Sequence, residues 1–266
     1  MRVANAPVSY GAFELTVGIL PNVPGPDQVL EAIAAAGYEG TELGPPGYLG
    51  SGERLRERLR RRRLRLAGAF VELRFGDGDL SPLEVTLDQL EGFDAQPILC
   101  DTGPRDGEVD LDGVGRALEL ARTRGFEPSF HHHMGTRVQT PAEIERLLEG
   151  TDVALLLDSG HLTAAGGDAV QAARDWRDRV AHVHVKDVRL AVLEAAPTWD
   201  EAWRGGAFCE LGGGDVDLEG FFGQLAGYSG WIVVEQDWVP APGDELAAHI
   251  EAQARNRRWL AEHVGL

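Results

Sequence analysis

The sequence predicts an α/β protein with a (β/α)8 (TIM) barrel fold. Eight short apolar segments of the β-strand type alternate with eight amphipathic segments of the helical type. This alternation indicates a parallel sheet, and eight repeats favour a closed barrel over an open, doubly wound sheet. The length of 266 residues also suits one such barrel, which typically has about 250 residues. We therefore predict a single barrel domain at 13–266, preceded by an N-terminal lead-in at 1–12.

The predicted elements follow one another without an interdomain linker. Strands are predicted at 13–20, 37–44, 66–75, 97–101, 128–133, 153–158, 180–187 and 231–237. Helices are predicted near 26–36, 53–64, 81–93, 108–124, 140–149, 167–178, 215–227 and 244–263. Thr140, Pro141 and Glu143 indicate a helix start, because they combine a capping hydroxyl, a proline at the first helical position and capping-box spacing. The glycines at 212–214 predict a backbone turn, and the long segment 188–214 is typical of a lid or binding loop.

The composition argues against several classes of protein. The net charge of −18 opposes binding to nucleic acid, which requires a basic surface. No apolar run approaches the roughly 20 residues that span a membrane, and the first residues lack the pattern of a signal peptide. Cys100 and Cys209 form no CxxC pair, so a thiolate zinc site is excluded and two reduced thiols are expected. We expect a cytoplasmic protein whose partner is a small molecule, with no membrane or nucleic acid.

Six of the eight histidines lie in three clusters, each at the end of a predicted strand. The clusters are HHH at 131–133, DSGH at 158–161 and HVH at 182–184, and a fourth strand ends at Glu235. Side chains alternate along a strand, and active groups of a barrel lie at the carboxyl ends of its strands. The inward groups that can then converge are His131 or His133, Asp158, His184 and Glu235. Imidazoles and carboxylates without sulfur predict a site for one divalent metal ion, with Mn²⁺ or Co²⁺ expected and Zn²⁺ or Mg²⁺ as alternatives.

Two further residues are predicted to take part in the chemistry. Of the 25 basic residues, all but Lys186 are arginines. A lysine can lose its proton where its surroundings lower its pKa, whereas an arginine cannot, and Lys186 shares the inward direction of His184. Glu42 ends a predicted strand and is either a general base with a raised pKa or the partner of an arginine. Glu72 and Arg74 also lie at predicted barrel-mouth positions.

At these clusters the sequence resembles the sugar phosphate isomerase/epimerase superfamily of xylose isomerase-like TIM barrels, and within it the inosose (2-keto-myo-inositol) dehydratases. The likeness is carried by HHHMGT at 131–136, DSGH at 158–161, HVHVKDVR at 182–189, the turn at 212–217, GWIVVE at 230–235 with the following 236–237, and GTE at 40–42. The resemblance implies Asp158, His184 and Glu235 as metal ligands, with His131 as the fourth. It also implies that His161 and Lys186 face the substrate. The segments 18–25 and 208–211 depart from the dehydratase pattern, so the metal chemistry is better supported than the substrate.

The predicted reaction is the dehydration of a polyhydroxy ketone through an enediolate. A metal that chelates the ketone oxygen and a neighbouring hydroxyl acidifies the adjacent C–H, and Glu42 or neutral Lys186 removes the proton. His133 or His161 then assists loss of the β-hydroxyl. A ketose isomerase or epimerase acting on a sugar shares the enediolate and is the alternative. An abasic-site endonuclease conflicts with the charge, a non-catalytic binding barrel is the last alternative, and whether the protein is a homo-oligomer stays open.

Overall fold

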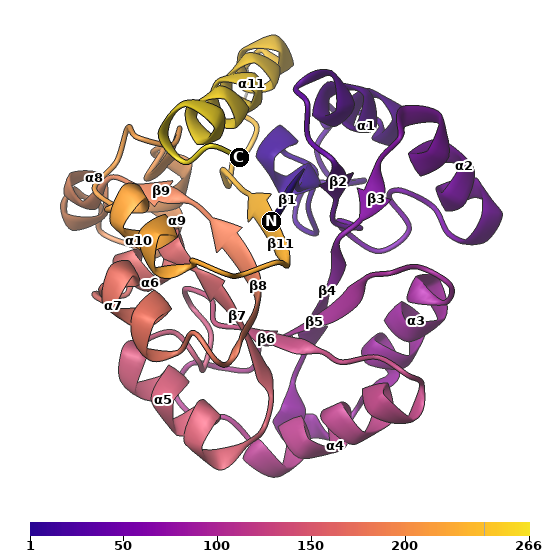
Figure 1. Cartoon of the computed structure of the whole chain (residues 1–266), viewed down its shortest axis with the longest axis vertical. Helices are drawn as coiled ribbons and strands as arrows, with labels where there is room; N and C mark the ends of the chain where they lie inside the picture. Colours follow the sequence, from indigo (N-terminus) through magenta and orange to yellow (C-terminus); the bar gives the residue numbers. More distant parts are fainter. Residues whose placement is uncertain (242) are drawn as a thin grey trace.

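A parallel β-barrel enclosed by helices forms the centre of the protein (Figure 1). The computed structural model describes residues 1–241 and 243–266. Within these residues the barrel sheet consists of nine strand segments: β1 (Arg2–Asn5), β2 (Gly40–Thr41), β3 (Arg65–Leu66), β4 (Gly68–Leu73), β5 (Gln96–Asp101), β6 (Ser129–His131), β7 (Ala154–Asp158), β8 (Val180–Val185) and β11 (Trp231–Val234). Their order is β3-β2-β1-β11-β8-β7-β6-β5-β4, and neighbouring strands are parallel.

The barrel closes because β3 and β4 belong to one chain segment that is interrupted only at Ala67. β3 pairs with β2, and β4 pairs with β5. At the interruption, the Ala67 N–H donates to the Thr41 carbonyl at 2.8 Å and the Leu43 N–H donates to the Gly68 carbonyl at 3.0 Å. With β3 and β4 counted as one strand, the barrel has eight, and the predicted (β/α)8 barrel is confirmed.

An outer ring of helices covers the barrel (Figure 1). It consists of α1 (Pro26–Ala35), α2 (Gly52–Arg62), α3 (Ser81–Leu90), α4 (Leu111–Thr123), α5 (Pro141–Gly150), α7 (Ala169–Asp175), α10 (Leu218–Gln224) and α11 (Leu246–His263). The core lies between this ring and the strands, where buried side chains such as Leu83, Leu147 and Phe221 of the helices join Leu155 and Ile232 of the strands. The predicted capping box at the start of α5 is present. Among the described helices, none combines the length and the apolar character needed to cross a membrane.

The first strand is not where the sequence predicts it, and the prediction of a lead-in at 1–12 is wrong. β1 lies at Arg2–Asn5 and pairs with β11 and β2. The segment 13–20 forms turns, in which N–H groups donate to carbonyls three or four residues earlier. Its apolar residues suggest a strand, but Leu15 and Ile19 are 62% and 66% exposed. β1 has only four residues and its two end residues are polar, so its apolar pattern is weaker than that of the segment 13–20.

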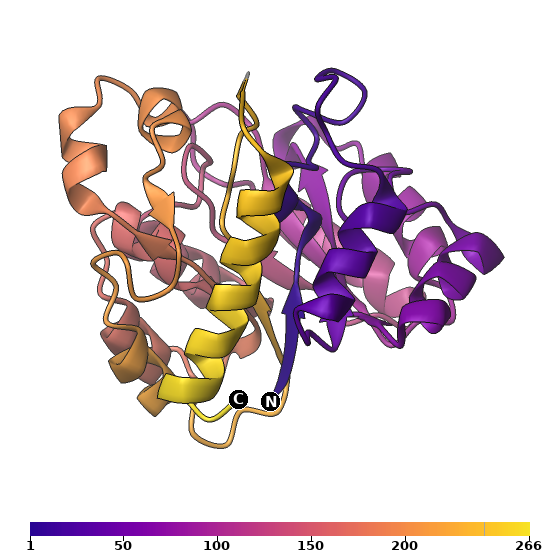
Figure 2. The same cartoon turned by 90° about the horizontal axis from the view of Figure 1, so that it is seen from above.

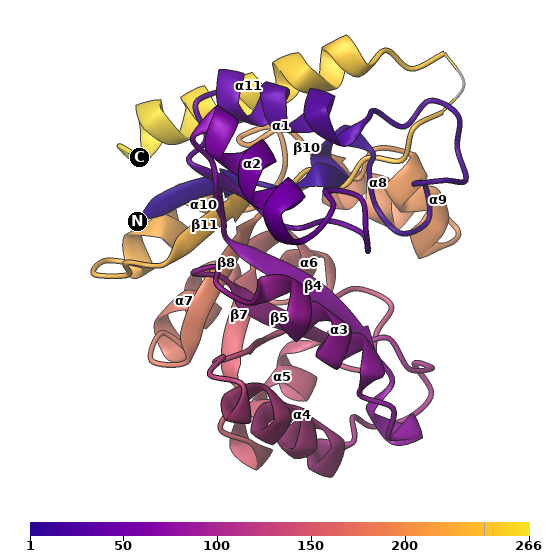
Figure 3. The same cartoon turned by 90° about the vertical axis from the view of Figure 1, so that its right-hand side faces the viewer.

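The segment 188–214 contains regular elements that the sequence did not predict. β9 (Asp187–Val188) and β10 (Phe208–Cys209) pair antiparallel, and α8 (Leu190–Ala195) and α9 (Trp199–Arg204) lie between them. A short helix, α6 (Ser159–Ala164), also follows β7 directly. Figures 2 and 3 show α8, α9 and the loop before α1 at the end of the barrel opposite both termini. Because β1 starts near the N-terminus, this end is the carboxyl end of the strands, where barrel proteins carry their active groups.

Candidate metal centre and pocket

Four adjacent strands bring the four predicted ligand side chains together. His131 ends β6, Asp158 ends β7, His184 lies near the end of β8 and Glu235 directly follows β11. The register aligns Asp158 with His184, and His184 with Val233 of β11. His131 and Glu235 lie at the carboxyl ends of the two flanking strands, and each of the four residues is at most 6% exposed.

The side-chain atoms of this cluster lie close enough to share one ion. Nδ1 of His184 is 3.0 Å from Oε2 of Glu235 and 3.7 Å from Oδ2 of Asp158. The same Oδ2 is 3.9 Å from Nε2 of His131. Oδ2 of Asp158 and Nδ1 of His184 are buried, and within the described residues they have no hydrogen-bond partner beyond their charged neighbours in this cluster. Two carboxylates buried this close together are costly without positive charge to balance them, and two imidazoles with two carboxylates are a donor set that fits a divalent cation.

The DSGH segment orients Asp158 through its local structure. Oδ1 of Asp158 accepts the backbone N–H of His161 at 2.8 Å and so caps α6, which leaves Oδ2 facing the cluster. Ser159 donates through Oγ to the Lys186 carbonyl and accepts the Lys186 N–H, at 2.8 and 3.0 Å. A Cβ at Gly160 would lie 2.5 Å from Cβ of Lys186, so only glycine permits this approach. The segment therefore sets the positions of both Asp158 and Lys186.

Lys186 is buried beside the same carboxylates. Its Nζ lies 2.8 Å from Oε2 of Glu235, 3.1 Å from Oδ2 of Asp158 and 3.2 Å from Oδ2 of Asp237. Burial by itself would lower the pKa of Lys186, but Asp158, Asp237 and Glu235 raise it well above its ordinary value. Burial would raise the pKa of Asp158, but Lys186 and the nearby imidazoles hold it well below its ordinary value. The ammonium group thus balances the carboxylates that a divalent ion would also bind.

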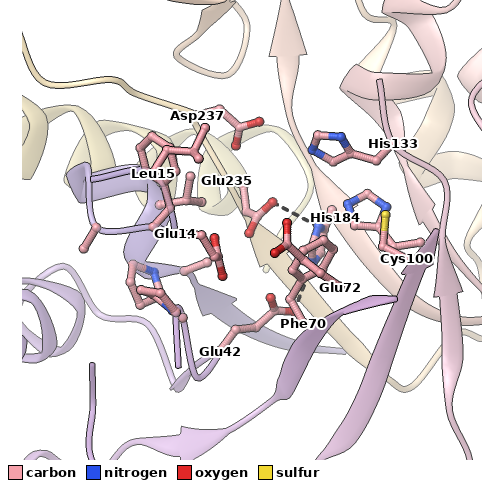
Figure 4. A pocket seen from close by; sticks show the side chains of 18 of the residues that line it. Glu14, Leu15, Glu42, Phe70, Glu72, Cys100, His133, His184, Glu235 and Asp237 are labelled. Atoms are coloured by element: carbon pink, nitrogen blue, oxygen red, sulfur yellow. Dashed lines mark hydrogen bonds and ion pairs between the residues drawn. The ribbon is translucent and has the colours of Figure 1, made fainter. Parts of the chain in front are cut away.

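Glu42 is paired with two histidines, and not with an arginine. Its Oε1 lies 2.9 Å from Nε2 of His182 and 2.9 Å from Nε2 of His184. Figure 4 shows Glu42 below His184, with Glu235 on the other side of that ring. Burial would raise the pKa of Glu42, but the two imidazoles hold it well below its usual range. This is the reverse of the raised pKa that the sequence led us to expect if Glu42 were a base.

His133 and His161 form a second imidazole group beside the first. Their ring centroids are 3.9 Å apart, and Nε2 of His161 is 3.5 Å from Oδ2 of Asp237. Burial lowers the pKa of both rings, with further lowering by neighbouring positive groups. His131 is the member of the HHH cluster that groups with Asp158 and His184, whereas His133 groups with His131 and His161. The geometry therefore favours His131 over His133 as the ligand.

A cavity of about 250 Å³ opens onto these side chains. Its walls include the aromatic residues Phe13, Phe70, Trp199 and Trp203 and the acidic residues Glu14, Glu42, Glu72, Glu235 and Asp237. Besides three histidines, Lys186 is the one cationic residue among the described residues that line it, and no arginine does. Figure 4 shows the carboxyl groups of Glu14, Glu72 and Glu235 turned into the same space. The pocket is thus strongly acidic, with an aromatic rim.

Three of these pocket residues were missed by the sequence reasoning. Glu14 lies in the segment that was predicted as a strand, so its position at the mouth had no signal in the sequence. Burial, together with the nearby charges of Glu72 and Glu235, raises the pKa of Glu14 to about 7. Trp199 and Trp203 come from α9, and their spacing of four residues, which places two side chains on one helix face, was the only available clue.

The glycine-rich turn at 212–217 is held by a buried carboxylate. Oδ2 of Asp187 accepts the N–H groups of Gly212 and Gly214, each at 2.9 Å, and Oδ1 accepts those of Val188 and Val216 at 2.9 and 3.1 Å. A Cβ at Gly214 would collide with this carboxylate. The expectation of a backbone turn is confirmed, and the turn ties the segment after α9 to the end of β8.

Comparison with known proteins supports the same fold and relates the chain to enzymes. Residues 108–263 match the model of the family described as xylose isomerase-like TIM barrel. An inosose dehydratase of Geobacillus thermodenitrificans is 37% identical over 183 residues, which are 65% of this chain and 59% of that protein, less than two thirds of its length. An inosose dehydratase of Lactiplantibacillus plantarum is 31% identical over 271 residues, with 89% of this chain and 88% of that protein covered.

A solved structure agrees with the fold. The crystal structure of the IolI protein with a bound zinc atom superposes with a TM-score of 0.74 at 14% identity, over 100% of both chains. At that identity the likeness supports the barrel architecture alone. The family match, which spans more than half of the chain, and the Lactiplantibacillus relative carry the assignment. The chain belongs to the xylose isomerase-like TIM barrel family.

Proposed function

We propose that this protein is a metal-dependent lyase that dehydrates a keto-inositol, an inosose-type polyhydroxy ketone. The observation that carries the proposal is the buried cluster of His131, Asp158, His184 and Glu235 at the mouth of a barrel whose relatives are named inosose dehydratases. We assign the four residues as ligands of one divalent ion. Mn²⁺ or Co²⁺ is expected and Zn²⁺ or Mg²⁺ is the alternative, because the donors are nitrogen and oxygen without sulfur.

Lys186 is assigned as the base that removes the proton next to the ketone. A bound divalent ion would supply Lewis-acid polarisation of the ketone and charge to stabilise the enediolate. An ion on Asp158 and Glu235 would also neutralise two of the three carboxylates that raise the pKa of Lys186, which frees the amine to accept a proton. Glu42 is the other base that the sequence offers, but its Oε1 already accepts two imidazole N–H groups.

Asp237 connects the base to an acid for the leaving hydroxyl. Its Oδ2 is 3.2 Å from Nζ of Lys186 and 3.5 Å from Nε2 of His161. The proton that Lys186 removes can pass through this carboxylate to His161 and leave with the β-hydroxyl as water. His133, whose ring lies beside that of His161 with the centroids 3.9 Å apart, is the alternative donor. The sum of these steps is the loss of one water molecule from the substrate, with both residues restored.

The charge of the pocket limits the class of substrate. No arginine lines the cavity within the described residues, and five acidic side chains do. A phosphate or carboxylate substrate would meet repulsion here without the bidentate cation that usually binds such groups. An uncharged polyol can instead donate its hydroxyls to the carboxylates and place its C–H faces on Trp199 and Trp203. This supports a keto-inositol or free sugar over a sugar phosphate or an abasic site in DNA.

The test combines metal analysis with a substrate screen over inososes and ketoses. The wild-type protein should contain about one equivalent of divalent metal and convert an inosose to a dione that absorbs in the ultraviolet. Conversion without a change in mass would identify a ketose isomerase or epimerase instead and overturn the dehydratase proposal.

A separate set of variants tests the assignment of the metal ligands. Asp158→Ala and Glu235→Ala should lose the bound metal, whereas Asp152→Ala, which removes an exposed carboxylate paired with Arg122, should keep it. Full metal occupancy in both site variants would refute the ligand assignment.

A further inference from the structure

We propose that Glu42 is a positioning residue that selects the tautomer and the direction of the His184 ring, so that Nδ1 of this imidazole faces Asp158 and Glu235. The inference rests on the proposed metal site and adds a role that the ligand set alone does not contain. Glu42 follows β2 on one side of the barrel, and His184 lies in β8 two strands beyond β1. The two residues are 142 positions apart and meet only inside the closed barrel.

The donors and acceptors in this contact are determined by chemistry. An ionised carboxylate only accepts hydrogen bonds, so each imidazole nitrogen at 2.9 Å from Oε1 of Glu42 must carry a hydrogen. For His184 this nitrogen is Nε2. The neutral form of His184, which is the form that can bind a metal ion, therefore has its lone pair on Nδ1, the atom 3.0 Å from Oε2 of Glu235 and 3.7 Å from Oδ2 of Asp158. That nitrogen is the one a metal ion at the cluster would need, and the partner on the other nitrogen selects it.

The hydrogen bond from His182 to Glu42 is directed by a similar contact on the other ring nitrogen of His182. Its Nδ1 lies 2.6 Å from Nε2 of Gln96, an amide nitrogen that can only donate, so Nδ1 accepts and Nε2 carries the hydrogen. Gln96 begins β5 at the opposite end of the barrel from the pocket. The result is one chain of hydrogen bonds, from Gln96 to His182 to Glu42, which also accepts from His184. Glu42, His182 and His184 are all at most 4% exposed, so water does not replace these bonds.

One oxygen of Glu42 accepts both hydrogen bonds. Variants at this position can therefore distinguish a positioning role from a role as the catalytic base. A glutamine at position 42 retains a carbonyl oxygen that can accept both N–H groups, but it cannot take a proton. A leucine of similar size removes the acceptor. If Glu42 positions His184, the glutamine variant should be the milder of the two. If Glu42 is the base, the two variants should be equally inactive while the affinity for metal is unchanged.

The experiment measures Co²⁺ affinity and the visible spectrum of bound Co²⁺ in the wild type, Glu42→Gln, Glu42→Leu and Glu72→Gln. Glu72 is a carboxylate of the pocket wall that pairs with no histidine among the described residues, and it is the matched control for affinity. Loss of a hydrogen-bond partner that orients a ligand typically weakens metal binding about 10–100-fold, and we expect this for Glu42→Leu together with an altered spectrum. Glu42→Gln should lose only a few-fold, and Glu72→Gln should match the wild type.

Nitrogen NMR of histidine-labelled wild-type protein tests the inference even if Glu42→Leu does not fold. His182 should carry its hydrogen on Nε2, and so should His184 when Co²⁺ is replaced by diamagnetic Zn²⁺. Hydrogen on Nδ1 of either ring, or wild-type Co²⁺ affinity in Glu42→Leu, would overturn the inference. A loss of about 10²–10⁴-fold in activity for Glu42→Gln with full Co²⁺ affinity would assign Glu42 as the base instead. If the wild type binds Co²⁺ but dehydrates no inosose, the proposed function fails while the positioning role of Glu42 is still decided by these variants.

Discussion

Replacement of Lys186 by methionine should destabilise the metal-free protein strongly. Methionine has nearly the length of lysine but no charge, so three buried carboxylates at 2.8–3.2 Å from Nζ would lose their cation. Removal of one partner from a buried ion pair costs about 3–5 kcal/mol, because the remaining charge stays buried and unpaired. For a chain of this size, that corresponds to a fall in Tm of roughly 6–20 °C. The measurement is thermal unfolding in the presence of a chelator.

The effect should depend on pH and on metal in defined directions. In the variant, the unpaired carboxylates have raised pKa values, so the folded state binds more protons than the unfolded state. The stability of the variant relative to wild type should therefore rise as the pH falls from 7 towards 5. A divalent ion should also stabilise the variant more than the wild type, because no ammonium competes for Asp158 and Glu235. At about 100 times its Kd an ion adds roughly 2.7 kcal/mol.

An exposed ion pair provides the matched control. Arg204 and Asp200 are 2.8 Å apart on α9, with side chains more than half exposed. Arg204→Met should cost less than about 1 kcal/mol, because water screens such a pair. If metal-free Lys186→Met melts within a few degrees of wild type and shows the same pH slope, the ammonium does not balance these carboxylates and our account of Lys186 is wrong.

Two further predictions concern the backbone that supports the site. Asp187→Ala should lower the free energy of unfolding by at least about 3 kcal/mol in urea titrations, because four N–H groups lose their acceptor, and Asp187→Asn should cost less. A loss under about 1 kcal/mol in the alanine variant would contradict this account of the turn. Gly160→Ala should displace Lys186, with a cost of about 1–3 kcal/mol and reduced activity. Gly115→Ala, in α4 with no atom within 4 Å of the new Cβ, is its control and should stabilise the protein by up to about 1 kcal/mol; equal effects of the two would refute the steric argument.

The sequence by itself determined the barrel and the side chains at its mouth. Apolar strand segments that end in histidine or carboxylate are local patterns, and in a parallel barrel their carboxyl ends must meet at one rim. The strand ends alone therefore group His131 or His133 with Asp158, His184 and Glu235. The presence of arginine at every Lys or Arg position but one likewise marked Lys186 as a residue with a particular role.

The tertiary structure decided which of these groups touch and what charge each carries. The partner of Glu42 could not be read from the sequence, because His182 is 140 positions away and the contact depends on the register of strands across the barrel. Lys186 could be predicted to point inward, but only the positions of Asp158, Glu235 and Asp237 show that its pKa is raised in the metal-free protein. Glu14 lines the pocket because the first strand is at Arg2–Asn5, so the segment that contains Glu14 follows this strand and lies at the mouth of the barrel. Local patterns specify elements and their ends, whereas protonation and pairing depend on distances between segments that only the folded chain brings together.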